Sequence, residues 1–155
     1  MWEYSYKTKQ KKLIKDVKLQ GGIKIINSDF EQKIVYVPGH DGVEIPMLLM
    51  HKKGLQQKRR NKTLMEVYGC YGLKMSQGFS ILNITAMERG FVVAHPYVRG
   101  GGEKGVLWHE AGKLEKKPNS IKDFISCAEY LVAEGITHPN LLTAKGSSAG
   151  ATLAA

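Results

Sequence analysis

The chain has 155 residues, of which 43% are hydrophobic, and this size and composition suit one globular domain with a sizeable core. Its apolar runs are far shorter than the roughly 20 residues of a membrane helix, and residues 1–7 lack the apolar stretch of a secretory signal. The net charge of +9 is compatible with acidic partners, but the basic run at 52–62 has no interleaved aromatic residues for stacking on bases. We therefore predict a solvated basic loop, with no nucleic-acid partner and no membrane partner; a nucleic-acid site at that loop is the less favoured alternative.

Residues 1–30 show weak periodicity and are expected to precede the main domain, which we place at 31–155. Two strands are predicted at 33–37 and 43–51, joined by a tight turn that contains Asp41-Gly42. The basic loop at 52–62 follows them, and 63–69 is predicted to be a short strand that ends at glycine. The domain thus begins with a β-hairpin.

From residue 80 onward, segments with helical and strand patterns alternate. A helix is expected at 80–90, with apolar positions Ile81, Leu82, Ile84 and Met87, and a buried strand at 91–98. A longer helix is expected from about Ser120 to Glu134, capped by Asn119 or Ser120, with its apolar face formed by Ile121, Phe124, Ile125, Ala128, Leu131 and Val132. A short strand at 141–145 follows. Strands that alternate with helices predict an α/β fold with a mostly parallel sheet and helices on both faces.

The last segment, 146–150, has the pattern G-x-S-x-G directly after a predicted strand and before a run that favours helix. In such a turn, side chains at Gly146 and Gly150 would collide with the neighbouring strand and helix, so glycine is needed there. The turn projects Ser148 from the carboxyl edge of the sheet, over a helix N-terminus that favours negative charge. Ser148 is the candidate nucleophile, and a helix N-cap serine is the structural alternative.

Acyl transfer also needs hydrogen-bond donors that face the developing oxyanion. The backbone N–H of Ala149, directly after the serine, is one candidate. The loop "VYGCYG" at 67–72 offers phenols at Tyr68 and Tyr71, with glycines that let the backbone pass close to the site. By itself, a tyrosine in such a loop is more often a packing residue.

Three stretches carry a more specific resemblance: "DGVEIPMLLMHKKG", "VYGCYG" and the segment from "RGGGEKGVLWHE" to "AKGSSAG". In this order and spacing they resemble the catalytic domain of the prolyl oligopeptidase family of serine peptidases, in particular its oligopeptidase B and prolyl endopeptidase-like branches. The resemblance covers about 34–155. It implies the N-terminal half of an α/β-hydrolase domain, truncated after the nucleophile turn.

The resemblance implies a role for each matching residue. Ser148 would be the nucleophile, the Tyr68 hydroxyl and the Ala149 N–H the oxyanion donors, and Tyr71 a packing aromatic. The loop residues Arg99, Gly100, Gly101, Gly102 and Glu103 would shape the site, although an ion pair between Arg99 and Glu103 is an open alternative. Two positions depart from the family pattern: Ala151 replaces a second glycine, and Cys70 is either a small buried filler or a reactive thiol.

The sequence order of the histidines and of Ser148 bears on whether the chain has a complete catalytic triad. All five histidines precede Ser148, whereas the family order places the acid and the histidine after the serine. We therefore expect an inactive fragment of an oligopeptidase that hydrolyses short peptides, with a (thio)esterase or a non-catalytic basic binding module as alternatives. No metal or cofactor is predicted. Two cysteines form no disulfide framework, which favours the cytoplasm.

Overall fold

The computed structural model describes residues 1–15, 26–55, 60–75 and 80–155. Residues 1–15 form a small sheet of their own, in which β1 (Trp2–Tyr4) pairs antiparallel with β2 (Lys11–Leu13). The sequence did not indicate this hairpin, because its few residues are all exposed and carry no buried apolar pattern. Of the predicted leading segment 1–30, residues 16–25 lie outside the described residues, as do 56–59 of the basic loop.

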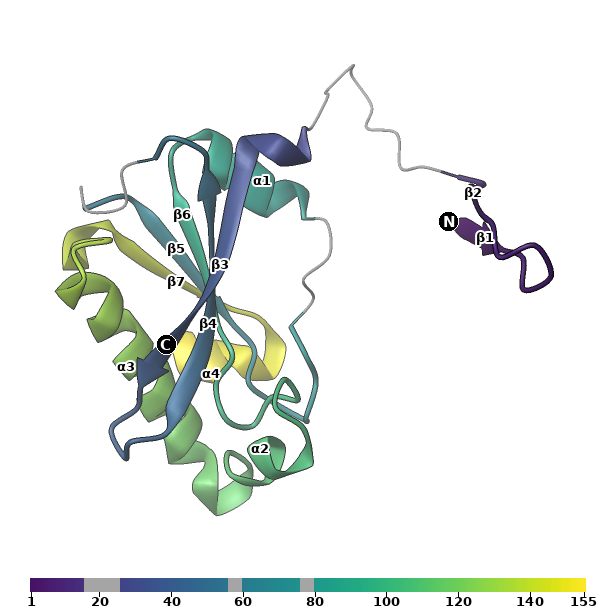
Figure 1. The fold of residues 1–155 in the computed structure, drawn as a ribbon. Helices are drawn as coiled ribbons and strands as arrows, with labels where there is room; N and C mark the ends of the chain where they lie inside the picture. The colour runs from purple at the N-terminus through teal and green to yellow at the C-terminus, as the bar shows by residue number, and fades with distance from the viewer. Residues whose placement is uncertain (16–25, 56–59, 76–79) are drawn as a thin grey trace.

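The main sheet has five strands in the order β3-β4-β6-β5-β7 (Figure 1). Its strands are β3 (Phe30–Pro38), β4 (Glu44–Lys52), β5 (Thr63–Val67), β6 (Val92–Pro96) and β7 (Leu142–Gly146). β3 pairs antiparallel with β4, and β4 antiparallel with β6, whereas β5 is parallel to both β6 and β7. The sheet is therefore mixed, with the predicted hairpin on one side and a parallel portion on the other.

The helices are α1 (Ile81–Glu88), α2 (Val106–Glu110), α3 (Lys117–Ala133) and α4 (Ala151–Ala154). Short 3-10 turns lie at η2 (Asn27–Asp29), η3 (Leu114–Lys116), η4 (Pro139–Leu141) and η5 (Ser148–Gly150). In the part of the chain that the structure describes, no helix combines the length and apolarity needed to cross a bilayer.

The core lies between one face of the sheet and the helices α3 and α4. It includes alternate strand residues such as Ile45, Met47, Met65 and Ala94, and it extends to Phe124, Cys127 and Leu131 of α3 and to Leu153 of α4. Because side chains of a strand alternate between faces, the intervening residues point to the opposite face, where α1 packs. Burial raises the pKa of the Cys127 thiol, in keeping with the predicted packing role of this cysteine.

Two helix predictions were wrong in detail. The longer helix begins at Lys117 with Pro118 in its first turn, so Ser120 is an interior residue and not its cap. The exposed Ile121 and Ile125 do not belong to its buried side. In α1, Ser80 caps the helix, but Ile81 and Leu82 are exposed, and the buried residues are Asn83 and Met87.

Candidate active site

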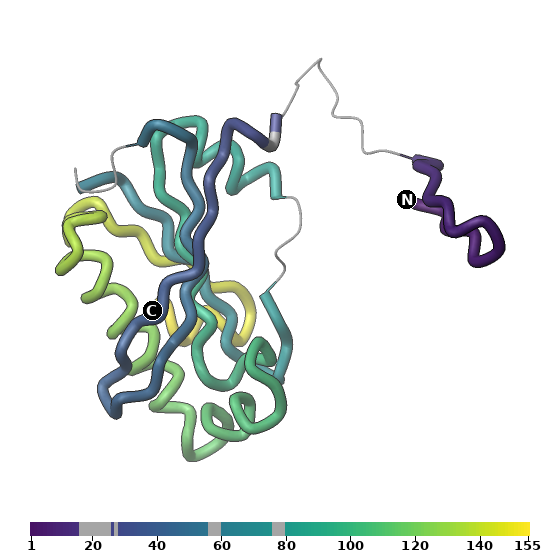
Figure 2. The backbone as a smooth tube through the Cα atoms, viewed as in Figure 1, coloured from purple at the N-terminus to yellow at the C-terminus, as the bar shows by residue number. Residues whose placement is uncertain are grey.

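The loops that follow β5, β6 and β7 lie at one end of the sheet (Figure 2). This follows from the topology, because the carboxyl ends of neighbouring parallel strands meet at the same edge. Val67, the last residue of β5, is paired with Gly146, the last residue of β7. The residue after each strand, Tyr68 and Ser147, therefore starts a loop at the same level of the sheet.

Ser148 lies in a tight turn between β7 and α4. It is exposed and has a φ of +50°, a backbone conformation that is rare for a residue with a side chain. A Cβ atom on Gly146 would lie 2.3 Å from the carbonyl oxygen of Gly150, so this position has no room for a side chain. Ser147 and Gly150 are the N-cap residues of η5 and α4, so Ser148 caps neither helix.

Tyr68 lies directly against this turn. A Cβ atom on Gly150 would be 2.8 Å from the Cα atom of Tyr68 and 2.8 Å from the carbonyl oxygen of Val67. Tyr68 is half-buried and packs against the hydrophobic core, whereas Tyr71 is 73% exposed and so does not pack as predicted. Ala149 is half-buried against the core. The structure thus brings the backbones of the serine turn and the Tyr68 loop into contact.

The glycine-rich loop at 99–105 packs against the Tyr68 loop. The Gly72 N–H donates to the Gly100 carbonyl at 3.0 Å, and the Gly102 N–H donates to the Leu73 carbonyl at 3.1 Å. A Cβ atom on Gly100 would lie 2.4 Å from the Gly69 carbonyl oxygen, and one on Gly102 would lie 2.0 Å from that of Gly72. The glycines therefore allow direct contact between two backbone segments.

Arg99 forms an ion-pair network, but Glu103, the partner considered from the sequence, is not part of it. Its guanidinium donates to Asp123 of α3 at 2.9 and 2.6 Å and to Asp41 of the β3–β4 turn at 2.6 Å. The Asp123 carboxylate raises the pKa of Arg99, and the guanidinium in turn lowers the pKa of Asp41. The alternative of an ion pair between Arg99 and Glu103 is therefore wrong.

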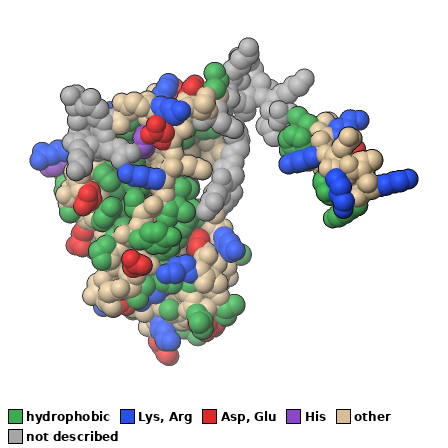
Figure 3. All heavy atoms as spheres, in the orientation of Figure 1, with side chains coloured by type: hydrophobic (Ala, Val, Ile, Leu, Met, Phe, Trp, Pro, Cys, Tyr) green, Lys and Arg blue, Asp and Glu red, His purple; other side chains and the backbone are tan. Residues whose placement is uncertain are grey.

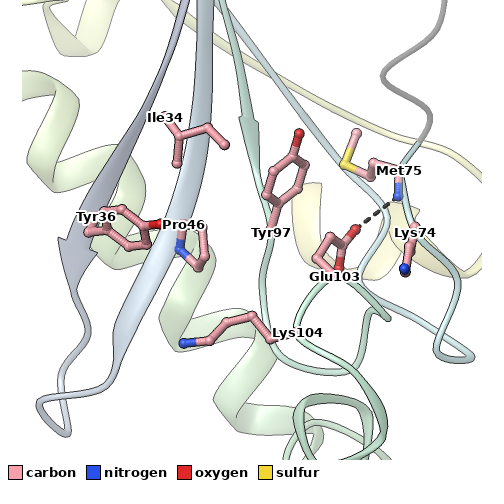
Figure 4. A pocket seen from close by; sticks show the side chains of 8 residues that line it. All are labelled: Ile34, Tyr36, Pro46, Lys74, Met75, Tyr97, Glu103 and Lys104. Carbon is pink, nitrogen blue, oxygen red and sulfur yellow. Dashed lines mark hydrogen bonds between the residues drawn. The ribbon is translucent and has the colours of Figure 1, made fainter.

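Glu103 instead supports the segment that follows the Tyr68 loop. One carboxylate oxygen accepts the Met75 N–H at 2.9 Å (Figure 4), and the other is buried with no hydrogen-bond partner among the described residues. Burial raises the pKa of this carboxyl, although the Met75 N–H opposes the shift. This second oxygen lies over Gly101, where a Cβ atom would be 2.4 Å away from it.

Three polar residues of α3 reach the two loops, although the sequence did not indicate that they belong to the site. The Lys117 ammonium donates to the Gly69 carbonyl at 2.6 Å, and the Ser120 hydroxyl donates to the Arg99 and Gly112 carbonyls. Asp123 holds Arg99 as described above. Their spacing in the sequence could have indicated them, because residues three apart, such as 117, 120 and 123, lie on one side of a helix.

His95 and His109, which lie on either side of the glycine-rich loop in the sequence, both contact other residues of the fold. His109 forms a 2.9 Å hydrogen bond between its Nδ1 and the Gly100 carbonyl. His95 is buried beneath α1, with its Nε2 3.5 Å from a Glu66 carboxylate oxygen and 3.3 Å from the Asn83 side-chain nitrogen. Burial lowers the pKa of His95, and the charge of Glu66 opposes this effect.

A sequence profile of the prolyl oligopeptidase family matches residues 77–155, which include the glycine-rich loop, α3 and the serine turn. The chain belongs to the prolyl oligopeptidase family. It is 36% identical over 131 residues to a prolyl endopeptidase of Elizabethkingia miricola, covering 84% of this chain and 19% of that protein. It is 35% identical over 153 residues to dipeptidyl aminopeptidase BI of Pseudoxanthomonas mexicana, covering 98% of this chain and 21% of that protein.

Solved structures of the family have the same fold. Oligopeptidase B from Trypanosoma brucei, in a closed form with covalently bound antipain, superposes with a TM-score of 0.90 at 32% identity, over 98% of this chain and 21% of that protein. A structure from an analysis of two prolyl endopeptidases gives the same TM-score and identity, over 98% of this chain and 22% of that one. The chain is thus part of an α/β-hydrolase catalytic domain and spans about a fifth of the length of these relatives.

Proposed function

We propose that the chain supplies the nucleophile and the oxyanion site of a serine-type oligopeptidase. In this proposal Ser148 attacks the carbonyl carbon of a short peptide, and the amine leaves as the acyl-enzyme forms. The Tyr68 hydroxyl and the Ala149 N–H donate to the oxyanion of the tetrahedral intermediate. Water then hydrolyses the acyl-enzyme. Family membership, together with the contact between the Tyr68 backbone and the serine turn, supports this assignment.

The single observation that carries the proposal is the geometry of the turn at Ser148. A non-glycine residue with a φ of +50°, flanked by two glycines that have no room for a side chain, holds an exposed hydroxyl at the carboxyl edge of the sheet. Such strain persists only where the surrounding structure enforces it, and it is concentrated at functional sites. The strained strand-to-helix turn is how α/β-hydrolases expose a serine nucleophile.

The general base and its acidic partner are proposed to come from residues outside 1–155, since the family order places them after the serine. By this proposal 31–155 is the first part of the catalytic domain, 1–30 belongs to the segment before it, and the chain alone is inactive. Arg99, Glu103 and the glycines of their loop shape the site through the contacts described above. We also propose a cytoplasmic location, because the two cysteines do not form a disulfide framework.

The test is covalent labelling of the intact protein with a serine-reactive fluorophosphonate, followed by kinetics on fluorogenic short peptides. We expect labelling of wild type and its loss in Ser148→Ala, while Ser147→Ala, the matched change at the adjacent hydroxyl, keeps most of it. Tyr68→Phe should lower kcat about 100- to 1,000-fold, the cost of one oxyanion donor. Labelling that survives in Ser148→Ala would contradict the proposal. Hydrolysis of thioesters without peptides would favour the esterase alternative.

A further inference from the structure

Lys117 is the first residue of α3, and its ammonium is directed at the backbone of the Tyr68 loop. Its Nζ lies 2.6 Å from the Gly69 carbonyl oxygen and 3.1 Å from the Cys70 sulfur. The side chain is half-buried, and among the described residues no carboxylate pairs with it. The N-terminus of a helix disfavours a cation, because the helix dipole is positive there. The contacts with Gly69 and Cys70 must offset that unfavourable interaction.

The carbonyl that Lys117 holds belongs to the residue directly after Tyr68. Gly69 has a φ of +59°, and a Cβ atom on it would lie 2.4 Å from Val98 and 3.3 Å from Leu153. The peptide group between Gly69 and Cys70 is thus fixed by packing on one side and by a charge-assisted hydrogen bond on the other. The Cα atom of the preceding residue, Tyr68, lies against Gly150.

Lys117 differs in its target from the other two polar residues of α3. Ser120 and Asp123 bind Arg99, through its carbonyl and its guanidinium respectively, and so hold the glycine-rich loop. Lys117, one turn earlier on the helix, reaches across to the loop after β5. One helix therefore anchors both loops that form the site, with Lys117 alone of the three contacting the segment that carries Tyr68.

We propose that Lys117 is a positioning residue that holds Tyr68 where its hydroxyl can donate to the oxyanion. This inference rests on the proposed function of Ser148 and Tyr68. An oxyanion donor acts only when it lies within about 2.7–3.1 Å of the developing charge, and a displacement of about 1 Å costs on the order of 100-fold in rate. Without the ammonium, the Gly69–Cys70 peptide group is held by packing alone, and we expect Tyr68 to shift with it.

The test compares Lys117→Met in two backgrounds of the intact protein, wild type and Tyr68→Phe, using kcat and KM on a fluorogenic short peptide. In the wild-type background we expect kcat to fall about 10- to 100-fold with KM changed less than about threefold. In the Tyr68→Phe background the same change should cost less than about threefold, because the donor that Lys117 positions is already absent. Lys117→Arg retains a cationic donor and should keep most of the wild-type rate. Lys122→Met, an exposed lysine on the same helix, is the matched control and should leave kcat unchanged.

An equal loss of kcat in both backgrounds, or full activity of Lys117→Met, would overturn the inference while Ser148 remains the nucleophile. If circular dichroism shows that Lys117→Met is not folded, the test rests on Lys117→Arg. A kcat of Lys117→Arg as low as that of Tyr68→Phe would then contradict the proposal. Absence of labelling at Ser148 in wild type is a different result, because it removes the proposed function itself and the inference with it.

Discussion

The two faces of the main sheet are formed by alternate residues of the same strands, yet they differ in character. The face toward α3 is apolar and closed: Ile45 and Met47 on it are completely buried, as is Leu131 of α3, which packs against it. The face toward α1 carries a polar row of Lys145, Glu66 and His95 on adjacent strands. At its other end, toward β3, Ile34 is 50% and Tyr36 60% exposed. Hydrophobic side chains gather at the centre of the view in Figure 3, over β3 and β4.

This difference shows which contacts stabilise the fold and which hold the loops of the site in position. From Phe124 onward, α3 completes the closed core with Phe124, Cys127 and Leu131, while the residues before Phe124 hold the two loops of the site. The α1 face instead has a hollow of about 550 Å³ between Tyr36, Tyr97 and Glu103 (Figure 4). Changes on the α3 face should therefore affect both folding and the site, and changes on the open face should be tolerated better.

The largest effect is expected at the polar end of the α3 face. Asp123→Ala should lower the free energy of unfolding by about 3–5 kcal/mol, because it leaves the buried guanidinium of Arg99 with Asp41 as its remaining carboxylate partner. Urea unfolding followed by circular dichroism measures this loss. The double variant Arg99→Met with Asp123→Ala should lose less than the sum of the two single variants. A loss below about 1 kcal/mol in Asp123→Ala would show that the network contributes little.

A matched pair of aliphatic truncations compares the two faces directly. Leu131→Ala, in the closed core, should cost about 2–5 kcal/mol of unfolding free energy, because it leaves a cavity. Ile34→Ala removes a similar volume from a half-exposed position and should cost less than about 1 kcal/mol. The same urea experiment applies to both variants. Equal losses would mean that the α1 face is closed in the protein as it exists in solution.

The smallest effect concerns the polar row under α1. Because the pKa of His95 is lowered in the folded state, the unfolded chain binds the extra proton first as the pH falls below about 6.5. The contribution of His95 to stability is therefore complete above that pH and decreases as the pH falls toward the lowered pKa. His95→Gln should flatten this part of the stability profile between pH 7 and pH 5, measured by thermal unfolding. An unchanged slope would place the titration on another group.

The local elements were largely predictable because their signals lie within a few residues. The hairpin followed from two runs of alternating or apolar residues around Asp41-Gly42, and the structure has β3 and β4 there in antiparallel register. The serine turn was marked by two glycines, and the structure shows no room for a side chain at either one. The start of α3 was misplaced, because Ser120 resembles a cap in sequence whereas its hydroxyl is turned inward to the Arg99 carbonyl.

Three features could be predicted before folding is considered: the family, the alternation of strands and helices after residue 80, and the glycines at the serine turn. Each depends on local sterics or on a contiguous motif. In contrast, the carboxylates that neutralise Arg99 and the carbonyl that accepts from Lys117 are known only from the folded chain. Those partners are 24, 58 and 48 residues away along the chain. A buried polar group must find a partner, but its identity depends on which segments the crossovers of the sheet bring together, and no local pattern contains that information.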